Sequence, residues 1–332
     1  MPMPTFSSIW TQLRPPEPDF TEKNLPDLAG KVYIITGGNT GIGKELARML
    51  YSKNGTIYVG ARSEEKAERA IDDIRRAEPN STGALVFLHV DLADLRTIKS
   101  SVESFTSREN RLDVLFNNAG IQAPGGGAEP AQTTQGYEIH LGVNTIGTFL
   151  LTRLLTPTLV ATVRSAQTDA VRVVWVSSSA AEFFGEKSVG LPVDDLDYHN
   201  SRPALHRYGL SKAGNWLHGA EFARRHCADG IVSIPLNPGN VNSDLYRDQN
   251  FIMRRIVASF THSPVYGAYT ELFAGLSPQV TMEKTGSWVG PFGRFMPIRS
   301  DLMDATKAQA EGGNGHVRKV WDWTEDQVSK YM

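Results

Sequence analysis

Short apolar runs alternate with longer amphipathic patterns along most of the chain. Consecutive apolar residues predict strands buried on both faces, whereas apolar residues spaced three to four apart predict helices. Strands are expected at residues 31–36, 56–60, 84–90, 112–118, 171–177 and 231–236. Helices are expected at residues 44–53, 64–77, 95–105, 133–161 and 205–227. This alternation predicts an α/β fold with a doubly wound, mostly parallel sheet that helices cover on both faces.

No internal repeat and no linker divides this alternating region. The glycine-rich residues 124–127 are typical of a loop rather than of a domain boundary. We therefore expect a single domain at residues 28–332, after an N-terminal extension at residues 1–27, with substrate-side segments at residues 183–205 and 243–276. In an open parallel sheet, ligands bind beyond the carboxyl ends of the strands, so candidate chemistry should directly follow the apolar runs.

The N-terminal extension contains a candidate helix. Phe6, Ile9, Trp10 and Leu13 recur at helical spacing, which predicts a short helix packed on the body of the protein. A contact with a membrane surface and disorder are the alternatives. Five prolines interrupt the first 24 residues, and an apolar core with a small-residue cleavage site is missing, so no secretory signal is expected.

The composition limits the kinds of molecule that the protein is expected to bind. The chain of 332 residues is 40% hydrophobic and 21% charged, with a formal net charge of −2, so a basic surface for nucleic acid is not expected. The single cysteine, Cys227, allows neither an internal disulfide nor a thiolate metal cluster, which fits a cytoplasmic protein without a metal. No run of about 18 apolar residues predicts a transmembrane helix.

A glycine-rich turn follows the first predicted strand and opens the first helix. Glycine permits tight turning and a close approach of the backbone to a ligand. The N-terminus of the helix then offers free N–H groups to a pyrophosphate, so the turn predicts a dinucleotide site. The cofactor-binding candidates in the turn are Gly37, Asn39, Thr40, Gly41, Ile42 and Gly43.

The end of the second predicted strand favours NADP(H) over NAD. An acidic residue there would bind the ribose 2′-hydroxyl of NAD, but the sequence has Ala61 and Arg62, and arginine can hold a 2′-phosphate. The alternative is that Arg62 caps a surface turn. Asp91, with Leu92 beside it, follows the third strand and is placed at the adenine; it could equally be the N-cap of the next helix.

Tyr208 and Lys212 stand four residues apart, on one face of a predicted helix. An unperturbed tyrosine has a pKa near 10, and a neighbouring Lys⁺ together with an oxidised nicotinamide would lower that pKa toward neutral pH. Three serines at residues 177–179 follow the fifth strand. A hydroxyl there could bind a substrate oxygen, and a structural serine turn is the alternative.

Asn144 lies inside the predicted helix 133–161. Asparagine is a mediocre helix former, and a buried one must find hydrogen-bond partners. We expect it to hold a water that connects Lys212 to bulk solvent. Asn117 and Asn118 end the fourth strand, where their side chains can tie neighbouring strands or contact the cofactor.

These features occur in the order found in short-chain dehydrogenases/reductases, which residues 28–290 resemble. The resemblance rests on residues 36–43, residues 117–120, Asn144, the serines, Tyr208 with Lys212, and residues 237–239. It implies a Rossmann-type fold of about seven strands and the catalytic residues Ser178, Tyr208, Lys212 and Asn144. It further implies cofactor contacts from Asn118, Ala119, Gly120, Tyr208, Lys212, Pro238, Gly239, Val241 and Ser243.

The resemblance also assigns roles. Tyr208 would be the proton donor or acceptor, Lys212 would bind the nicotinamide ribose, and Val241 would contact the carboxamide. Residues 142–152 look like the retinol-dehydrogenase and WW-domain-oxidoreductase branch, and residues 264–277 look like its fungal members. A homodimer through the helices that carry Asn144 and Tyr208 is implied by the same resemblance.

Aromatic and aliphatic residues in the two substrate-side segments predict an apolar, fairly bulky substrate, unless they simply belong to the core. The predicted function is NADP(H)-dependent reduction of a ketone, or oxidation of the corresponding secondary alcohol, on a small molecule such as a fungal secondary metabolite. Alternatives are a retinol- or steroid-type alcohol dehydrogenase, a catalytically silent NADP-binding regulator, and a non-redox cyclase or epimerase on the same fold.

Overall fold

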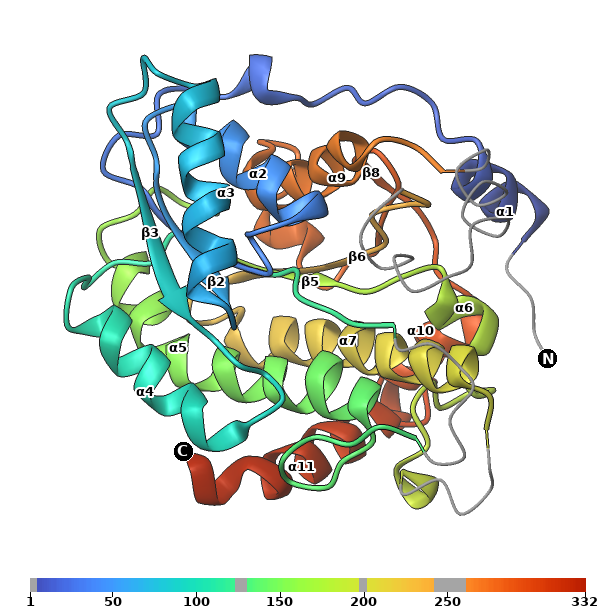
Figure 1. The fold of residues 1–332 in the computed structure, drawn as a ribbon. Helices are drawn as coiled ribbons and strands as arrows, with labels where there is room; N and C mark the ends of the chain where they lie inside the picture. Colours follow the sequence, from blue (N-terminus) through green and yellow to red (C-terminus); the bar gives the residue numbers. More distant parts are fainter. Residues whose placement is uncertain (1–4, 123–129, 197–201, 242–260) are drawn as a thin grey trace, which may run out of the picture.

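The computed structural model describes residues 5–122, 130–196, 202–241 and 261–332. Within these residues, eight strands form one sheet in the order β3-β2-β1-β4-β5-β6-β7-β8 (Figure 1). They are β1 (Val32–Thr36), β2 (Thr56–Ala61), β3 (Ala84–His89), β4 (Val114–Asn117), β5 (Arg172–Val176), β6 (Val232–Leu236), β7 (Val289–Gly290) and β8 (Arg294–Phe295). All neighbours pair in parallel except β7 and β8. The predicted doubly wound sheet is confirmed, with one antiparallel strand added at its edge.

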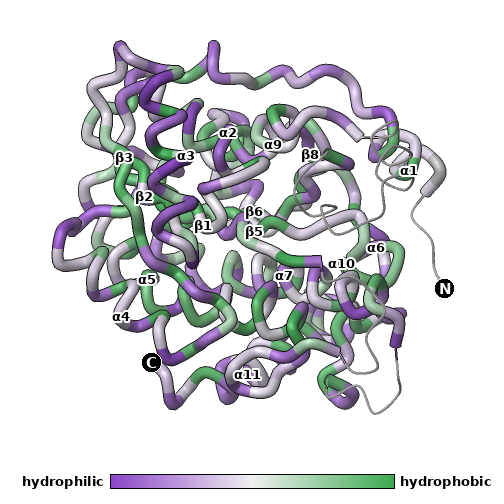
Figure 2. Tube along the Cα trace, viewed as in Figure 1, coloured by the Kyte–Doolittle hydropathy of each residue, from purple (hydrophilic) through white to green (hydrophobic). Residues whose placement is uncertain are grey.

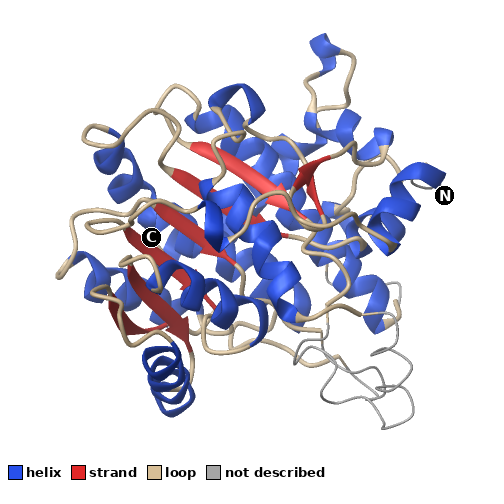
Figure 3. Cartoon of the chain, turned by 90° about the horizontal axis from the view of Figure 1, so that it is seen from above, coloured by secondary structure: helices blue, strands red, loops and turns tan. Residues whose placement is uncertain are grey.

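Helices cover both faces of the sheet (Figures 1 and 3). On one face lie α2 (Gly41–Tyr51), α3 (Glu64–Ala77) and α9 (Pro264–Leu276). On the other face lie α4 (Leu95–Thr106), α5 (Thr148–Val163) and α7 (Ala204–His226), and α11 (His316–Val328) packs against α7. The shorter helices are α1 (Phe6–Leu13), α6 (Ala180–Phe184), α10 (Ser300–Thr306), the π-helical η2 (Leu141–Gly147), and the 3-10 turns Glu22–Asn24, Val193–Asp195, Met282–Lys284, Gln309–Glu311 and Ser329–Tyr331.

The core lies in two layers, one on each face of the sheet, and apolar residues line the strands between them (Figure 2). Every residue of β1, β4, β5 and β6 is buried, because these central strands are covered on both faces. The layer under α5 and α7 contains Phe149, Trp175 and Trp216. The layer under α2 and α9 contains Ile35, Phe116 and Phe273. This burial explains why continuous apolar runs marked the strands.

The helix predicted at residues 133–161 begins later than expected. Residues 133–136 form a turn in which Gly136 has φ +83°, a conformation that favours glycine. The Glu138 carboxylate then accepts hydrogen bonds from the N–H groups of His140 and Leu141 at 2.9 and 3.0 Å, which starts the helix there. Residues 139–140, η2 and α5 are helical, so the prediction was wrong for residues 133–138.

The continuous helix Leu141–Val163 has the length and hydropathy that could cross a membrane. Of its most apolar window, however, 61% is buried inside the protein, where the helix packs against α4 and α7. A core helix of an α/β domain has the same composition, because its apolar residues face the sheet on one side and neighbouring helices on the other. This packing accounts for its hydropathy.

The N-terminal helix forms as α1, but the buried face is not the apolar one. Trp10 and Leu13 are 58% and 55% exposed, whereas Ser8 and Gln12 are buried. From α1 the chain runs along the side of the sheet that carries α2 and α9 before it enters β1 (Figure 1). The helix therefore packs on the body as predicted, through polar side chains that the spacing of the apolar residues did not indicate.

Candidate active site

The glycine-rich turn between β1 and α2 is tight and leaves no room for a side chain at Gly43. Gly37 and Gly41 have φ of +68° and +54°. A Cβ at Gly43 would lie 2.6 Å from both the Gly37 carbonyl oxygen and Asn118 Nδ2. Thr40 is the N-cap of α2, and its side chain accepts no cap hydrogen bond from the first N–H groups of the helix. A backbone cradle at a helix N-terminus fits a dinucleotide pyrophosphate.

The end of β4 is fastened to this turn. Asn118 Nδ2 donates to the Thr36 carbonyl at 2.7 Å, and Ala119 N donates to Thr36 Oγ1 at 2.9 Å. Asn117 instead donates to Thr152 on α5 at 2.8 Å. The expected tie between neighbouring strands is therefore made by Asn118, which brings residues 118–120 beside the glycine-rich turn.

The residues predicted to contact the adenosine half of the cofactor directly follow β2 and β3. Arg62 is exposed, and the N-cap of α3 is Ser63, so the alternative that Arg62 caps this turn was wrong. No hydrogen bond or ion pair to the Arg62 guanidinium is found among the described residues. Asp91 accepts a hydrogen bond from Ala93 N at 2.9 Å, whereas the N-cap of α4 is Asp94. Asp91 is therefore not the cap of that helix, and its neighbour Leu92 is buried.

Asn144 lies in η2, where the helix widens to π geometry, a feature often found at functional sites. Its side chain is fully buried. Oδ1 accepts from Ile121 N at 2.9 Å, and Nδ2 donates to Ile121 O and to Ser211 Oγ, both at 3.0 Å. Asn144 therefore joins the segment after β4 to α7, and its predicted contact with a relay water stays a prediction.

Tyr208 and Lys212 are both buried on α7, and Lys212 Nζ lies 5.9 Å from the centre of the tyrosine ring. Nζ donates to the Val176 carbonyl at 2.8 Å. Burial lowers the pKa of Lys212 to about 8, because the interior disfavours the charged ammonium. A Cβ at Gly120 would lie 2.9 Å from Nζ, so the lysine sits against the segment expected at the cofactor.

The three serines after β5 have different environments. Ser177 is buried and donates to the Lys212 carbonyl at 2.6 Å, which is a structural role. Ser178 is half-buried, and its Oγ accepts from Ala180 N at 3.1 Å, which leaves the hydroxyl hydrogen able to donate. A Cβ at Gly209 would lie 2.8 Å from the Ala180 carbonyl, so glycine lets the start of α6, directly after the serines, approach α7 beside Tyr208.

The opposite helix contributes a residue that sequence analysis missed. Glu271 on α9 is fully buried, and neither carboxylate oxygen has a hydrogen-bond partner among the described residues. Burial raises the pKa of Glu271 to about 8, against the opposing effect of the Lys212 charge. The signal was present in the sequence, since a single carboxylate interrupts the apolar pattern of α9. It was overlooked because that segment was assigned to the substrate side.

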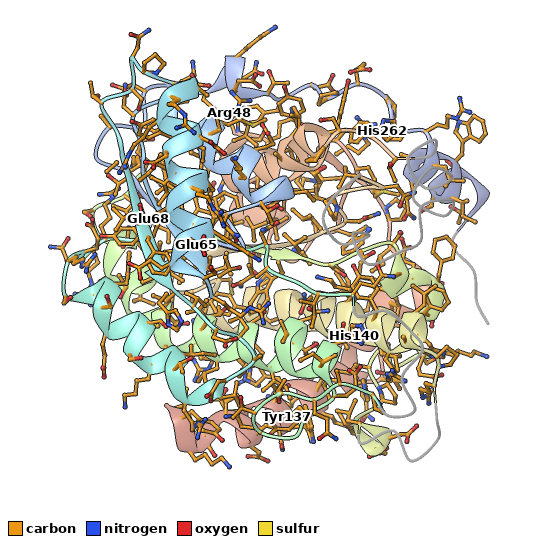
Figure 4. The ribbon with its side chains drawn as sticks, viewed as in Figure 1. Arg48, Glu65, Glu68, Tyr137, His140 and His262 are labelled. Carbon is orange, nitrogen blue, oxygen red and sulfur yellow. The ribbon has the colours of Figure 1, made fainter. Side chains whose placement is uncertain are left out.

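His140 and Tyr137 lie on the segment that leads into η2 (Figure 4). The fully buried His140 ring packs edge-on against the Tyr208 ring with centroids 6.0 Å apart. Its Nδ1 lies 2.6 Å from Glu138 Oε1, which also accepts from Arg207 Nε at 3.1 Å. These contacts hold the Tyr208 side of α7 against the start of the helix that carries Asn144.

The segment after β6, residues 237–241, forms another wall of the candidate active site. Gly239 has φ +92° and donates its N–H to Asn237 Oδ1 at 3.1 Å. Thr270 on α9 donates to the Pro238 carbonyl at 3.3 Å, and Val241 is buried. Ser243 lies outside the described residues, as does most of the predicted substrate-side segment 243–276.

The other substrate-side segment, at residues 183–205, is described except for residues 197–201. Phe183 and Phe184 are half-buried. Leu191 is fully buried and belongs to the core, which was the alternative interpretation. Tyr198 lies outside the described residues, so the predicted apolar lining stays a prediction.

Comparison with known proteins identifies the family. A family model for short chain dehydrogenase matches residues 31–189. A short-chain dehydrogenase/reductase from Phomopsis amygdali is 53% identical over 333 residues, covering 99% of this chain and 98% of the relative. Short-chain dehydrogenase/reductase bet4 from Neocamarosporium betae is 52% identical over 327 residues, covering 98% and 94%.

Among solved structures, an uncharacterized protein from Mycobacterium Paratuberculosis is similar with a TM-score of 0.65 and 28% identity, covering 93% of this chain and 97% of that one. The fold thus agrees with the family that the sequence relatives indicate. The chain belongs to the short-chain dehydrogenase/reductase family and is an oxidoreductase of its fungal type.

Proposed function

We propose that this protein transfers a hydride between NADP(H) and the carbonyl carbon of an apolar, fairly bulky ketone, or the carbinol carbon of the corresponding secondary alcohol. The observation that carries the proposal is the junction of Tyr208, Lys212 and Asn144. These buried residues meet at the carboxyl ends of the strands, where the Lys212 ammonium lies against Gly120. The nicotinamide supplies the redox chemistry when it is bound, while the protein positions it and tunes the proton transfer.

Tyr208 is the proposed proton donor for reduction and the proton acceptor for oxidation. A positive charge on Lys212 favours the phenolate of Tyr208 and thereby lowers its pKa toward neutral pH. Among the described residues, Lys212 Nζ donates one hydrogen bond, to the Val176 carbonyl, so it keeps protons for a ribose hydroxyl. Ser178 donates a hydrogen bond to the substrate oxygen, which stabilises charge as it develops there.

Arg62 supports the preference for NADP(H). Its exposed guanidinium follows Ala61, so no carboxylate is present at the end of β2 to repel a 2′-phosphate or to bind a 2′-hydroxyl. The remaining expected contacts are proposed as in the family, with Gly37 to Gly43 at the pyrophosphate, Asp91 and Leu92 at the adenine, and residues 118–120 and 238–241 along the nicotinamide half.

We propose a cytoplasmic protein, since its single cysteine, Cys227, is a free and exposed thiol. A homodimer through α5 and α7 is opposed by the packing of the C-terminal helix. The C-terminal helix α11 packs there, with Trp321 4.8 Å from Phe149 between ring centroids and Glu325 2.8 Å from Arg153. A dimer through these helices would have to displace α11, so we propose a monomer. Light scattering of the purified chain distinguishes the two states.

The function is tested with purified protein, NADPH or NADH, and a panel of aromatic and alicyclic ketones. Stoichiometric oxidation of NADPH with formation of the alcohol supports the proposal. Activity confined to retinoids or steroids would support the alternative alcohol dehydrogenase. Tight NADPH binding without turnover of any substrate would favour a regulator, and product formation without net oxidation of the cofactor would favour a cyclase or epimerase.

A further inference from the structure

The N-terminal helix reaches the wall of the candidate active site through one buried side chain. Gln12 is only 4% exposed. Its Nε2 donates to Glu182 Oε2 at 2.8 Å, and its Oε1 accepts from Asn237 Nδ2 at 3.1 Å. These partners lie 170 and 225 residues away in sequence. A single amide thus bridges two segments that follow neighbouring strands of the sheet.

Both partners belong to segments that carry proposed functional residues. Glu182 lies on α6, whose first turn is built on the serine segment: Ala181 N and Glu182 N donate to the carbonyls of Ser178 and Ser179 at 3.0 Å. Asn237 opens the segment that contains Pro238, Gly239 and Val241, and its Oδ1 holds the Gly239 N–H. Gln12 therefore connects the proposed substrate-binding serine with the proposed nicotinamide wall.

The charge of the Glu182 carboxylate determines how the Gln12 amide is oriented. The Glu182 carboxylate is buried and accepts from Arg299 N at 3.0 Å in addition to Gln12. Burial raises the pKa of Glu182 to about 6, so at neutral pH the carboxylate is ionised and can only accept. Gln12 must then turn its NH₂ group toward Glu182 and its oxygen toward Asn237. The amide is satisfied in one orientation only.

Arg299 holds α6 from the other side. Its guanidinium donates to the Glu182 and Gly185 carbonyls at 2.5 and 2.9 Å. Asn237, in contrast, has Gln12 as the only side-chain partner of its Nδ2 among the described residues. Loss of Gln12 would leave α6 attached to Arg299 but would remove the hydrogen bonds through which α1 links α6 to the segment after β6.

We propose that Gln12 is a positioning residue, which holds the serine segment and the segment 237–241 in the relative placement that hydride transfer requires. The inference rests on the proposed function and gives the N-terminal extension a role in it. A small misplacement of reacting groups costs up to about a hundredfold in rate. The polar face of α1 is buried for this reason, while Trp10 and Leu13 are left exposed.

The test compares Gln12→Leu with Leu13→Ala, a matched control on the same helix whose side chain is exposed. Hydrogen exchange of the cofactor-free protein, the NADPH dissociation constant from fluorescence titration, and kcat at saturating NADPH are measured. Gln12→Leu should speed amide exchange in residues 180–185 and 237–241, and should lower kcat about tenfold or more. The control should match the wild type in all three measurements.

A double variant that exchanges the two side chains distinguishes a positioning role of Gln12 from a general loss of stability. In Gln12→Glu/Glu182→Gln, the amide at 182 can donate to the carboxylate at 12 and accept from Arg299 N, while that carboxylate accepts from Asn237. The double variant should recover slow exchange and most of kcat, whereas Gln12→Glu alone should resemble Gln12→Leu. This rescue isolates the coupling between the two positions.

The proposal would be overturned if Gln12→Leu had the same exchange rates and kcat as the control. It would also be overturned if the exchange rates and kcat of Gln12→Glu/Glu182→Gln were no closer to the wild type than those of either single variant. Hydrogen exchange and NADPH affinity need no substrate. If the wild type reduces none of the ketones, the proposed function fails. Unchanged exchange in Gln12→Leu would still refute the bridge, and faster exchange in residues 180–185 and 237–241 would still support it.

Discussion

The amide of Asn144 donates a hydrogen bond of 3.0 Å to the hydroxyl of Ser211, which donates in turn to the main-chain oxygen of Tyr208 at 2.7 Å. Ser211 directly precedes Lys212. The link therefore joins the π-helical turn η2 to the stretch of α7 that carries the proposed acid–base pair. It also explains why a mediocre helix former occupies a fully buried helical position, since an apolar side chain could not make this contact.

Replacing Asn144 should damage catalysis more than replacing its partner. Asn144→Ala removes three hydrogen bonds and leaves the Ile121 backbone groups unsatisfied, so we expect kcat to fall about a hundredfold. Ser211→Ala removes only the link to α7 and should cost a few-fold. Steady-state kinetics with NADPH and the best ketone measure both; equal kcat for Asn144→Ala and the wild type would refute the proposed support.

The buried carboxyl of Glu271 should make stability depend on pH. Its pKa, raised to about 8 in the fold, means that the native state keeps a proton that the unfolded chain releases above about pH 4.5. The contribution of Glu271 to the free energy of unfolding should therefore decrease as pH rises from about 5 to 8. Glu271→Gln should remove this decrease, which is on the order of a few kcal/mol.

Denaturant unfolding of the cofactor-free protein at several pH values measures this slope. Glu68→Gln, at an exposed position on α3, is the matched control and should keep the slope of the wild type (Figure 4). The same slope in wild type and Glu271→Gln would mean that the carboxyl is already ionised in the fold, contrary to this account.

Arg62 should decide between the two nicotinamide cofactors. Arg62→Ala removes a charge-assisted contact with the 2′-phosphate, so the KM for NADPH should rise about tenfold to a hundredfold. The KM for NADH should stay unchanged. Arg69→Ala, an exposed arginine on α3 paired with Glu65, serves as the control. An equal effect of Arg62→Ala on both cofactors would argue against contact with the phosphate.

Gly43→Ala should weaken both cofactors. The new Cβ would lie 2.6 Å from the Gly37 carbonyl oxygen, and a backbone atom cannot move aside as a flexible side chain can. We expect the NADPH and NADH dissociation constants to rise together by about tenfold or more. Gly38→Ala meets its nearest atom at 3.1 Å and should have a smaller effect in the same fluorescence titration. If Gly43→Ala binds as well as wild type, the pyrophosphate does not lie on this turn.

The periodic parts of the fold could be predicted from the sequence, because burial imposes the period. On α3, for example, the apolar residues recur at helical spacing and form its buried face: Ala67, Ala70, Ile71 and Ile74. The strands β7 and β8 have only two residues each, too few for any period to be visible. The start of the helix before Asn144 depends on the Glu138 carboxylate and on the turn at Gly136, which apolar spacing does not register.

The site residues that belong to sequence motifs could be predicted. Those that reach the site only through tertiary contacts could not. Ser178, Tyr208, Lys212 and Asn144 follow from a family pattern. The contacts of Gln12 span 170 residues or more, and those of Glu271 depend on burial. Side-chain spacing on α1 favoured an apolar buried face, but hydrogen bonds to Glu182 and Asn237 determined which face is inside.

The central claim is that the Tyr208 hydroxyl transfers the proton that accompanies hydride transfer. Turnover of the best ketone at saturating NADPH, measured for the wild type and for Tyr208→Phe, tests it most directly, with the NADPH dissociation constant measured in parallel. The account predicts that kcat falls by about a hundredfold to ten-thousandfold while NADPH binding stays within a few-fold of the wild type. Tyr208→Phe with wild-type turnover would contradict it.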